Sequence, residues 1–100
     1  MFVLNITTNI SETIKTEWLE WHRTFFIKEM MDSGLFVSYQ FYELMEVEDS
    51  GCTFVTQFSF DKIDQYSAYM EGYQKQLSAA TFSKWGDQII SFRTLLRSVQ

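Results

Sequence analysis

The chain has 100 residues, a net charge of −5, and a composition that is 46% hydrophobic and 18% aromatic. A chain of this length is expected to form one domain, residues 1–100, around a single core. Its eight basic residues are scattered along the sequence, which disfavours nucleic acid and anionic membrane surfaces as partners. Aromatic side chains exceed what a small core easily hides, so we expect an aromatic-lined pocket or a subunit interface.

The first residues, MFVLNITTNISE, lack a basic region, and their apolar run is too short for a signal peptide or a membrane span. The expected location is therefore the cytoplasm. Cys52 is the only cysteine, so neither an intrachain disulfide nor a cysteine-based zinc site is expected. The sequence contains no glycine-rich phosphate loop, nucleophile elbow, paired histidines or carboxylate cluster with ligand spacing. It therefore predicts no metal and no cofactor.

The first third of the chain predicts a strand and then a helix. Residues 2–8 alternate apolar and polar side chains after a hydrophobic start, which is typical of a strand. Asn9 or Ser11 then offers a helix N-cap. Apolar residues recur at helical spacing to about Met31, and Gly34 suits the end of this helix. The recurring residues are Ile14, Trp18, Trp21 and Phe25.

The middle of the chain predicts a β-hairpin. Residues 36–47 are rich in Phe, Tyr and Val and predict a long strand. The turn residues at 48–51 then lead into a second strand, residues 52–60, that returns beside the first.

A second helix and a last strand complete the chain. Asp61 is expected to cap a helix that continues almost to Gly86, and Gly72 is expected to weaken or bend it. The last strand is IISFRTLL, residues 89–96, which contains Arg93. The element order predicts an α+β, ferredoxin-like βαββαβ sandwich, in which a four-stranded antiparallel sheet carries both helices on one face. The other face of the sheet is left open.

Alternation along each strand assigns side chains to the two faces. Phe2, Leu4 and Ile6 are expected to face the helices. In the last strand Ile90, Phe92 and Leu96 are expected in the core, and either face of residues 36–47 could point inward. We favour the following residues on the open face: Val3, Asn5, Thr7, Ser38, Gln40, Tyr42, Thr53, Val55, Gln57, Ser59, Ile89, Ser91, Arg93 and Leu95.

Arg93 would then lie in a polar strip framed by aliphatic side chains. One interpretation is that its guanidinium lies exposed or pairs with a carboxylate across an interface. The other is that it binds a carboxylate or phosphate of a ligand, with Asn5 and Gln57 supplying neutral hydrogen bonds. The candidate ligand-binding residues are Arg93, Asn5, Gln57, Ser91, Thr7, Tyr42 and His22.

His22 is the only histidine, and it lies within the apolar arc of the first helix. A histidine can act as a general base or a metal ligand. Glu29, however, lies about 10 Å further along the helix axis, too far for a direct pair. The pattern favours a core or interface residue over a metal or haem ligand.

The stretches EWLEWH, SGLF, TFVTQFSF and FRTLL resemble an uncharacterised family of short bacterial proteins, a domain of unknown function (DUF4286). The resemblance covers nearly the whole chain, and EWLEW and ISFRTLL are its most specific parts. It implies a relative of the dimeric α/β-barrel proteins, in which two ferredoxin-like sheets meet face to face. The family has a His-Ile-Pro triplet where this chain has Phe26, Ile27 and Lys28, whereas the family's arginine matches Arg93.

Three functions remain open on the sequence. The leading hypothesis is a homodimeric module, paired through the open sheet face, with a cleft on that face for a small anionic or aromatic ligand. The second is a small-molecule enzyme of the dimeric α/β-barrel type, an oxygenase, isomerase or dehydratase without a tightly bound metal. The third is a purely structural dimer.

Overall fold

The sheet of the protein has four antiparallel strands in the order β2-β3-β1-β4. The computed structural model describes residues 1–45 and 51–99. The predicted turn at 48–51 lies outside them except for Gly51, as do the last two residues of the strand predicted to end at 47. The strands are β1 (Phe2–Ile10), β2 (Ser38–Glu43), β3 (Cys52–Phe60) and β4 (Ile89–Arg97).

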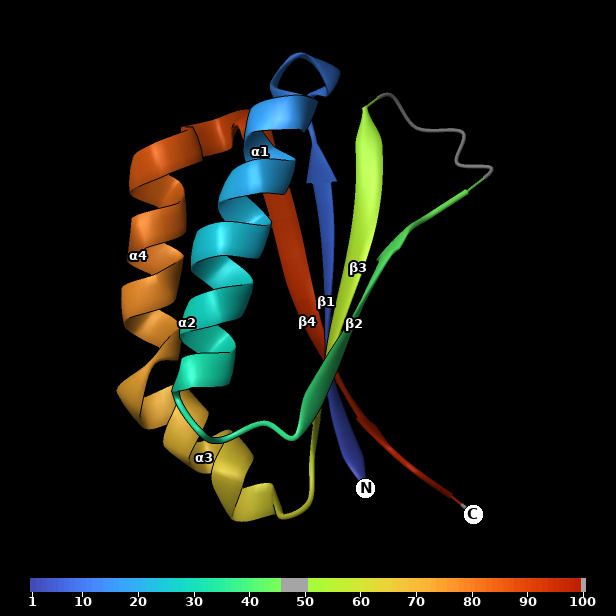
Figure 1. Cartoon of the computed structure of the whole chain (residues 1–100), viewed down its shortest axis with the longest axis vertical. Coiled ribbons are helices and arrows are strands. Elements are labelled where there is room, and N and C mark those ends of the chain that lie inside the picture. The colour runs from blue at the N-terminus through green and yellow to red at the C-terminus, as the bar shows by residue number, and fades with distance from the viewer. Residues whose placement is uncertain (46–50, 100) are drawn as a thin grey trace.

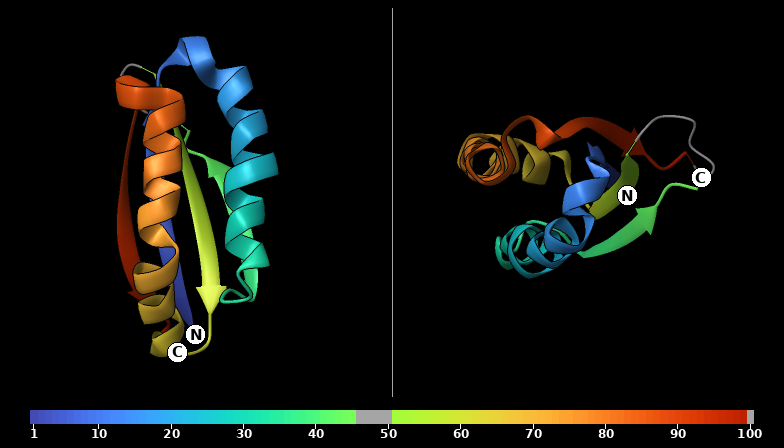
Figure 2. Two further views of the ribbon diagram at one scale, coloured as in Figure 1. Left: turned by 90° about the vertical axis from the view of Figure 1, so that its left-hand side faces the viewer. Right: turned by 90° about the horizontal axis from the view of Figure 1, so that it is seen from above.

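Both helical segments cover the same face of this sheet (Figures 1 and 2), so the predicted ferredoxin-like α+β sandwich is confirmed. The first segment is nearly continuous: η1 (Glu12–Ile14), α1 (Lys15–Trp21), the π-helical turn η2 (His22–Phe26) and α2 (Ile27–Asp32). The second consists of α3 (Ile63–Gly72), α4 (Gln74–Trp85) and the short η3 (Gly86–Gln88).

The second helical segment breaks where Gly72 predicted a weak point, because α3 ends there and α4 begins at Gln74. The predicted cap at Asp61 is wrong. The N-terminus of α3 is instead capped by Gln65, whose side-chain oxygen accepts hydrogen bonds from the backbone N–H groups of Asp61 and Lys62. A glutamine three residues into a helix can reach back in this way.

The core lies between the helices and the two central strands. In β1 and β3 every second residue is buried, and Leu4, Phe58 and Phe60 are completely inaccessible to solvent. Burying each of these side chains stabilises the fold by about 1.5–3 kcal/mol. The first helical segment covers this core with four buried side chains, those of Trp18, Phe26, Ile27 and Met30.

The face assignment is confirmed for three strands. Thr7 lies opposite Val55, and Val55 lies opposite Tyr42, so these three share the open face because directly paired residues point the same way. Ser38 and Gln40 share it as well, since they pair with Ser59 and Gln57.

The assignment is wrong for β4. Arg93 pairs with Ile6 and Ser91 with Thr8, and both β1 residues are buried beneath the helices. Arg93 and Ser91 therefore point toward the helices. The prediction placed the bulkier set of side chains inward, but Ile90, Phe92 and Leu96 lie on the open face, where they are 72%, 61% and 42% exposed. Size misleads here because β4 is an edge strand without a buried residue.

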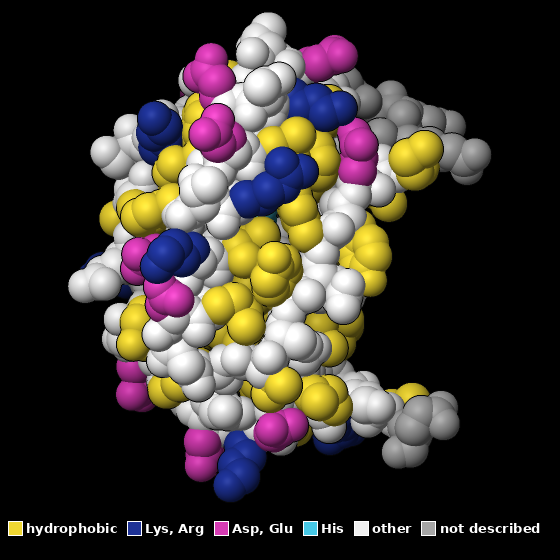
Figure 3. All heavy atoms as spheres, in the orientation of Figure 1, with side chains coloured by type: hydrophobic (Ala, Val, Ile, Leu, Met, Phe, Trp, Pro, Cys, Tyr) yellow, Lys and Arg dark blue, Asp and Glu magenta, His cyan; other side chains and the backbone are white. Residues whose placement is uncertain are grey.

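These three β4 side chains add apolar surface to the open face, beyond that of its residues on β1 and β3. Seen edge-on in Figure 3, the side of the molecule away from the helices is hollowed and carries several hydrophobic side chains. The helical side carries charged groups of both signs. No helix of residues 1–45 and 51–99 is long and apolar enough to cross a membrane.

Candidate functional site: a cleft between α4 and β4

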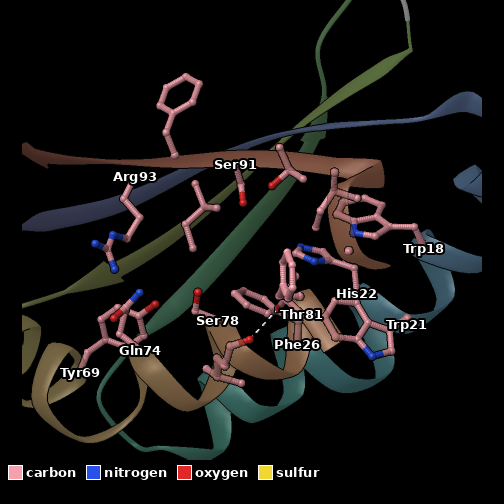
Figure 4. Close-up of a pocket in the computed structure, with 17 residues that line it drawn as sticks. Trp18, Trp21, His22, Phe26, Tyr69, Gln74, Ser78, Thr81, Ser91 and Arg93 are labelled. Atoms are coloured by element: carbon pink, nitrogen blue, oxygen red, sulfur yellow. Dashed lines mark hydrogen bonds between the residues drawn. The ribbon is translucent and has the colours of Figure 1, made fainter. Parts of the chain in front are cut away.

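A cleft of about 480 Å³ lies between the helices and the β1–β4 part of the sheet. Figure 4 shows Arg93 and Ser91 pointing into it from β4, with α4 on the opposite side. Polar and aromatic side chains from the helices complete its walls. The polar ones are Gln74, Ser78 and Thr81 of α4, and the aromatic ones are Trp18, Trp21 and Phe26 of α1 and η2.

The cleft exists because the inner face of α4 is small and polar. Gln74, Ser78 and Thr81 follow one another at spacings of four and three residues and therefore share one face of the helix. The Thr81 hydroxyl donates a hydrogen bond to the Leu77 carbonyl at 2.7 Å. Of its twelve residues, α4 buries only Leu77 and Trp85. Such a face cannot fill the space above β4.

Arg93 and Tyr69 form one end of the cleft. Figure 4 shows the Arg93 side chain directed toward Tyr69 and Gln74, and its Nη1 lies 3.3 Å from the Met70 sulfur, a weak acceptor. Burial raises the pKa of the Tyr69 phenol, while the charge and hydrogen bonding of Arg93 oppose that rise. Tyr69 therefore stays protonated and can donate a hydrogen bond beside the guanidinium.

Arg93 is the only charged residue among the described residues that line the cleft. The ion pairs within residues 1–45 and 51–99 join Lys15 to Glu43 and Lys28 to Asp32, and neither involves Arg93. Its charge therefore has no carboxylate partner in the part of the chain that the structure describes. The electrostatic character of this end of the cleft is positive in a protein of net charge −5.

His22 forms the other end of the cleft. Its ring stacks on Trp18 and on Phe26, with centroid distances of 4.5 and 5.0 Å, and its Nε2 lies 2.8 Å from the Thr56 hydroxyl oxygen. Burial, and to a smaller extent the charge of Arg23, lower the pKa of His22 to about 3. The ring is neutral at physiological pH. His22 also begins the π-helical turn η2, a distortion that is frequent at functional sites.

The predicted site residues divide between the two sides of the sheet. Arg93, Ser91 and His22 line the cleft, whereas the others lie on the open face. There the Gln57 amide donates to the Asn5 side-chain oxygen at 3.1 Å, and Asn5 in turn donates to the Thr7 hydroxyl at 3.3 Å. Tyr42 lies on the same face and is 49% exposed. The single polar strip expected from the sequence does not form.

Sequence reasoning missed the contribution of the second helical segment. Tyr69, Gln74, Ser78 and Thr81 line the cleft, yet none was a candidate. The available signal was the run of small polar residues at positions 74, 78 and 81, which is unusual for the inward face of a covering helix. No group of three or more His, Cys, Asp or Glu side chains that could hold a metal ion occurs within the described ranges.

The fold and the cleft together define a ferredoxin-like α+β protein with a cleft of polar and aromatic side chains between its helices and its sheet. The chain belongs to the family described as "Domain of unknown function (DUF4286)", whose sequence model matches residues 1–99. The resemblance seen in the sequence is thereby confirmed. No curated protein is similar enough in sequence to match.

Solved structures with the same fold have little sequence in common with this chain. A protein from Bacillus halodurans described as an "ethyl tert-butyl ether d (ethd) family protein" has a TM-score of 0.73 at 10% identity, over 99% of this chain and 100% of that one. A dimeric ferredoxin-like protein from an uncultured marine organism has a TM-score of 0.71 at 10% identity, over 99% of this chain and 95% of that one. A MhuD variant with two manganese protoporphyrin IX molecules bound per active site has a TM-score of 0.64 at 14% identity, over 100% of this chain and 96% of that one.

Proposed function

We propose that the protein is a homodimer that binds a small molecule in the cleft between its helices and its sheet. The observation that carries this proposal is Arg93, a cation that lines the cleft without a carboxylate partner among the described residues. The cleft volume of about 480 Å³ falls within the range of about 300–1,000 Å³ that is usual for ligand sites. A ligand with a carboxylate or phosphate would satisfy the guanidinium.

The place of the ligand in this proposal differs from the sequence-based expectation. The open sheet face was expected to hold it because Arg93 was assigned there. The β1–β4 register moves Arg93 to the helix side, and the proposed ligand site moves with it. The open face is left with neutral side chains that already bond to one another, such as Asn5 and Gln57.

A second copy of the chain is the proposed partner of the open face. Ile90, Phe92 and Leu96 expose apolar surface there, and soluble monomers seldom expose large contiguous apolar patches. Several solved structures with this fold are described as dimeric. Asn5, Thr7 and Gln57 already bond to one another, which reduces the number of polar groups that covering this face would leave unpaired. A stable interface of this kind buries at least about 1,200 Å².

Light scattering after size exclusion tests the dimer with two matched variants. Phe92→Glu places a charge on the open face, whereas Phe82→Glu changes a similarly exposed phenylalanine of α4, 70% against 61% exposed. We expect a dimer mass for the unchanged protein and for Phe82→Glu at micromolar concentration, and a monomer for Phe92→Glu. A monomer mass for the unchanged protein would overturn the dimer.

Thermal shift with a panel of compounds tests ligand binding, since a ligand that binds only the native state stabilises it by mass action. The panel holds aliphatic and aromatic carboxylates, phosphate esters, their neutral amide or alcohol analogues, and manganese protoporphyrin IX, which the MhuD variant binds. Arg97 lies on the same face of β4, opposite Phe2, but outside the cleft. Arg93→Leu should weaken the binding of an anion at least tenfold, and Arg97→Leu less than threefold. A panel in which nothing binds favours the purely structural dimer.

A further inference from the structure

The cleft has two polar ends of different character. At one end the Arg93 guanidinium and the protonated Tyr69 phenol present positive charge and hydrogen-bond donors, and Gln74 lies beside them (Figure 4). At the other end the polar group is the neutral imidazole of His22, which is set among aromatic rings. A ligand that touches both ends must therefore carry two different polar groups.

The sheet register relates the backbone positions that carry the two ends of the cleft. Thr56, the hydrogen-bond partner of His22, lies opposite Ile6, and Ile6 lies opposite Arg93. These three residues form one row across β3, β1 and β4. Because neighbouring strands lie about 4.8 Å apart, the Cα atoms of Thr56 and Arg93 are roughly 10 Å apart across the sheet. Since Figure 4 shows Arg93 and His22 at opposite ends of the cleft, the two polar groups of the ligand are expected at opposite ends of a small molecule.

The second ring nitrogen of His22, Nδ1, has no hydrogen-bond partner among the described residues. The one hydrogen bond of the ring within the described residues is that of Nε2 with Thr56. Since His22 lines the cleft and Nδ1 makes no hydrogen bond within the described residues, Nδ1 is the ring atom left to bond to a ligand there.

The rings around His22 restrict how a ligand can approach it. Trp18 covers one face of the imidazole and Phe26 the other, with interplanar angles of 21° and 11°. A ligand can therefore meet only the edge of the ring, where Nδ1 forms an in-plane hydrogen bond. A neutral imidazole has one donor and one acceptor nitrogen, and the tautomer decides which is which. A hydroxyl group matches Nδ1 in either tautomer, because it can donate or accept.

The space between the two polar ends has both apolar and polar walls, and Ser78, Thr81 and Ser91 supply the polar part. Ile6 on the sheet side and Leu77 and Phe26 on the helix side line it, and all three are buried. The apolar side chains can pack against the body of a ligand, and a rigid body is favoured over a flexible chain because ordering a flexible ligand costs conformational entropy.

We propose that the ligand is a planar aromatic carboxylate with a hydroxyl group at the far end of the ring, and this inference rests on the proposed binding function. The carboxylate lies at Arg93 and Tyr69, the ring lies between β1 and α4, and the hydroxyl bonds to Nδ1 of His22. His22 thereby becomes a specificity residue that distinguishes hydroxylated from unsubstituted rings.

Isothermal titration with four compounds separates the two ends of the ligand. The compounds are para-hydroxycinnamate, cinnamate, and the amides of both acids. We expect para-hydroxycinnamate to bind most tightly. Loss of the hydroxyl should weaken binding about fivefold to tenfold, and replacement of the carboxylate by the amide should weaken it tenfold or more, because a charged hydrogen bond is stronger than a neutral one.

Two variants assign each preference to its residue. His22→Phe keeps an aromatic ring between Trp18 and Phe26 and should abolish the preference for the hydroxyl while retaining that for the carboxylate. Arg93→Leu should do the reverse, with Arg97→Leu as its control. If His22→Phe does not fold, the comparison of hydroxylated and unsubstituted acids with the unchanged protein still decides the inference.

The outcomes distinguish this inference from the proposed function on which it rests. If other anions of the panel bind but none of the four compounds does, the inference is wrong and the binding function stands. The inference is also wrong if the hydroxyl gives no preference or if its preference survives in His22→Phe. If no compound of either set binds, both the inference and the binding function are wrong.

Discussion

The two halves of the molecule differ in how tightly their sheet and helices pack. In the packed half, β1 and β3 lie beneath α1, η2 and α2, and every second strand residue is buried. In the open half, β4 faces α4, yet β4 has no buried residue and α4 buries only Leu77 and Trp85. The same sheet therefore passes from a filled core to a strand with space on its helix side and exposed apolar side chains on its other side.

This difference separates the residues that hold the fold together from those available to partners. Leu4, Phe58 and Phe60 are inaccessible and can act only through packing. The two faces of β4 offer separate surfaces instead, with Arg93 on the helix side and Phe92 on the open side. A ligand in the cleft and a second copy on the open face would thus share one strand as a common wall.

The largest expected effect contrasts one phenylalanine from each half. Phe58→Ala removes a ring that is 0% exposed and should lower the free energy of unfolding by about 3–5 kcal/mol, because it leaves a cavity in a close-packed core. Phe82→Ala removes a ring of α4 that is 70% exposed and should change it by no more than about 0.5 kcal/mol. Urea unfolding at one fixed protein concentration measures both.

The fixed concentration matters because association would add to the apparent stability. Similar losses for the two variants would mean that α4 packs as tightly as the core, and the distinction between the halves would fail.

The pH dependence of stability tests how far the packed half encloses His22. The pKa of His22 is about 3 in the folded chain against an ordinary 6.5, so between these values the unfolded chain holds more protons. The free energy of unfolding should therefore fall as the pH falls from 6.5 toward 3, by at most about 1.4 kcal/mol per pH unit from this group. Above pH 6.5 the contribution is fully present.

His22→Gln isolates this contribution from that of the carboxylates, because glutamine cannot be protonated in this range but can bond to Thr56. The difference in stability between the unchanged protein and the variant should shrink or reverse as the pH falls. Urea unfolding at several pH values measures it, and parallel pH profiles for the two proteins would contradict the burial of a neutral histidine.

The packed half was predictable from the sequence, and the open half was not. Alternation along β1 and β3 identified the inward side chains because one face of each strand is clearly more apolar, as with Phe54, Phe58 and Phe60. In β4 both faces carry aliphatic residues, so the pattern does not decide between Ile89 and Ile90. The register with β1 decides it, and register is a property of pairing that no single strand contains.

The candidate site was found only in part for the same reason. Arg93 and His22 were recognised as polar residues within apolar runs, which is a signal that a local pattern can carry. Their approach to Ser78 and Thr81 depends on where α4 lies above β4. The sequence gives the spacing of those residues but not the distance of the helix from the sheet.

The smallest expected effect on stability comes from adding side-chain volume in the cleft, and it tests whether the cleft is unfilled. Ile10→Phe adds volume at a residue of β1 that is 0% exposed and should lower the free energy of unfolding by about 1–3 kcal/mol, because a filled core resists a larger side chain. Ser78→Leu also adds volume, but at an exposed residue that lines the cleft, and should change the free energy of unfolding by about 0.5 kcal/mol or less.

The leucine of Ser78→Leu would occupy space that the ligand needs, so binding of any compound found by thermal shift should be lost while the fold persists. If Ser78→Leu instead destabilises the protein as much as Ile10→Phe, α4 closes on β4 in solution, and the open half is packed after all.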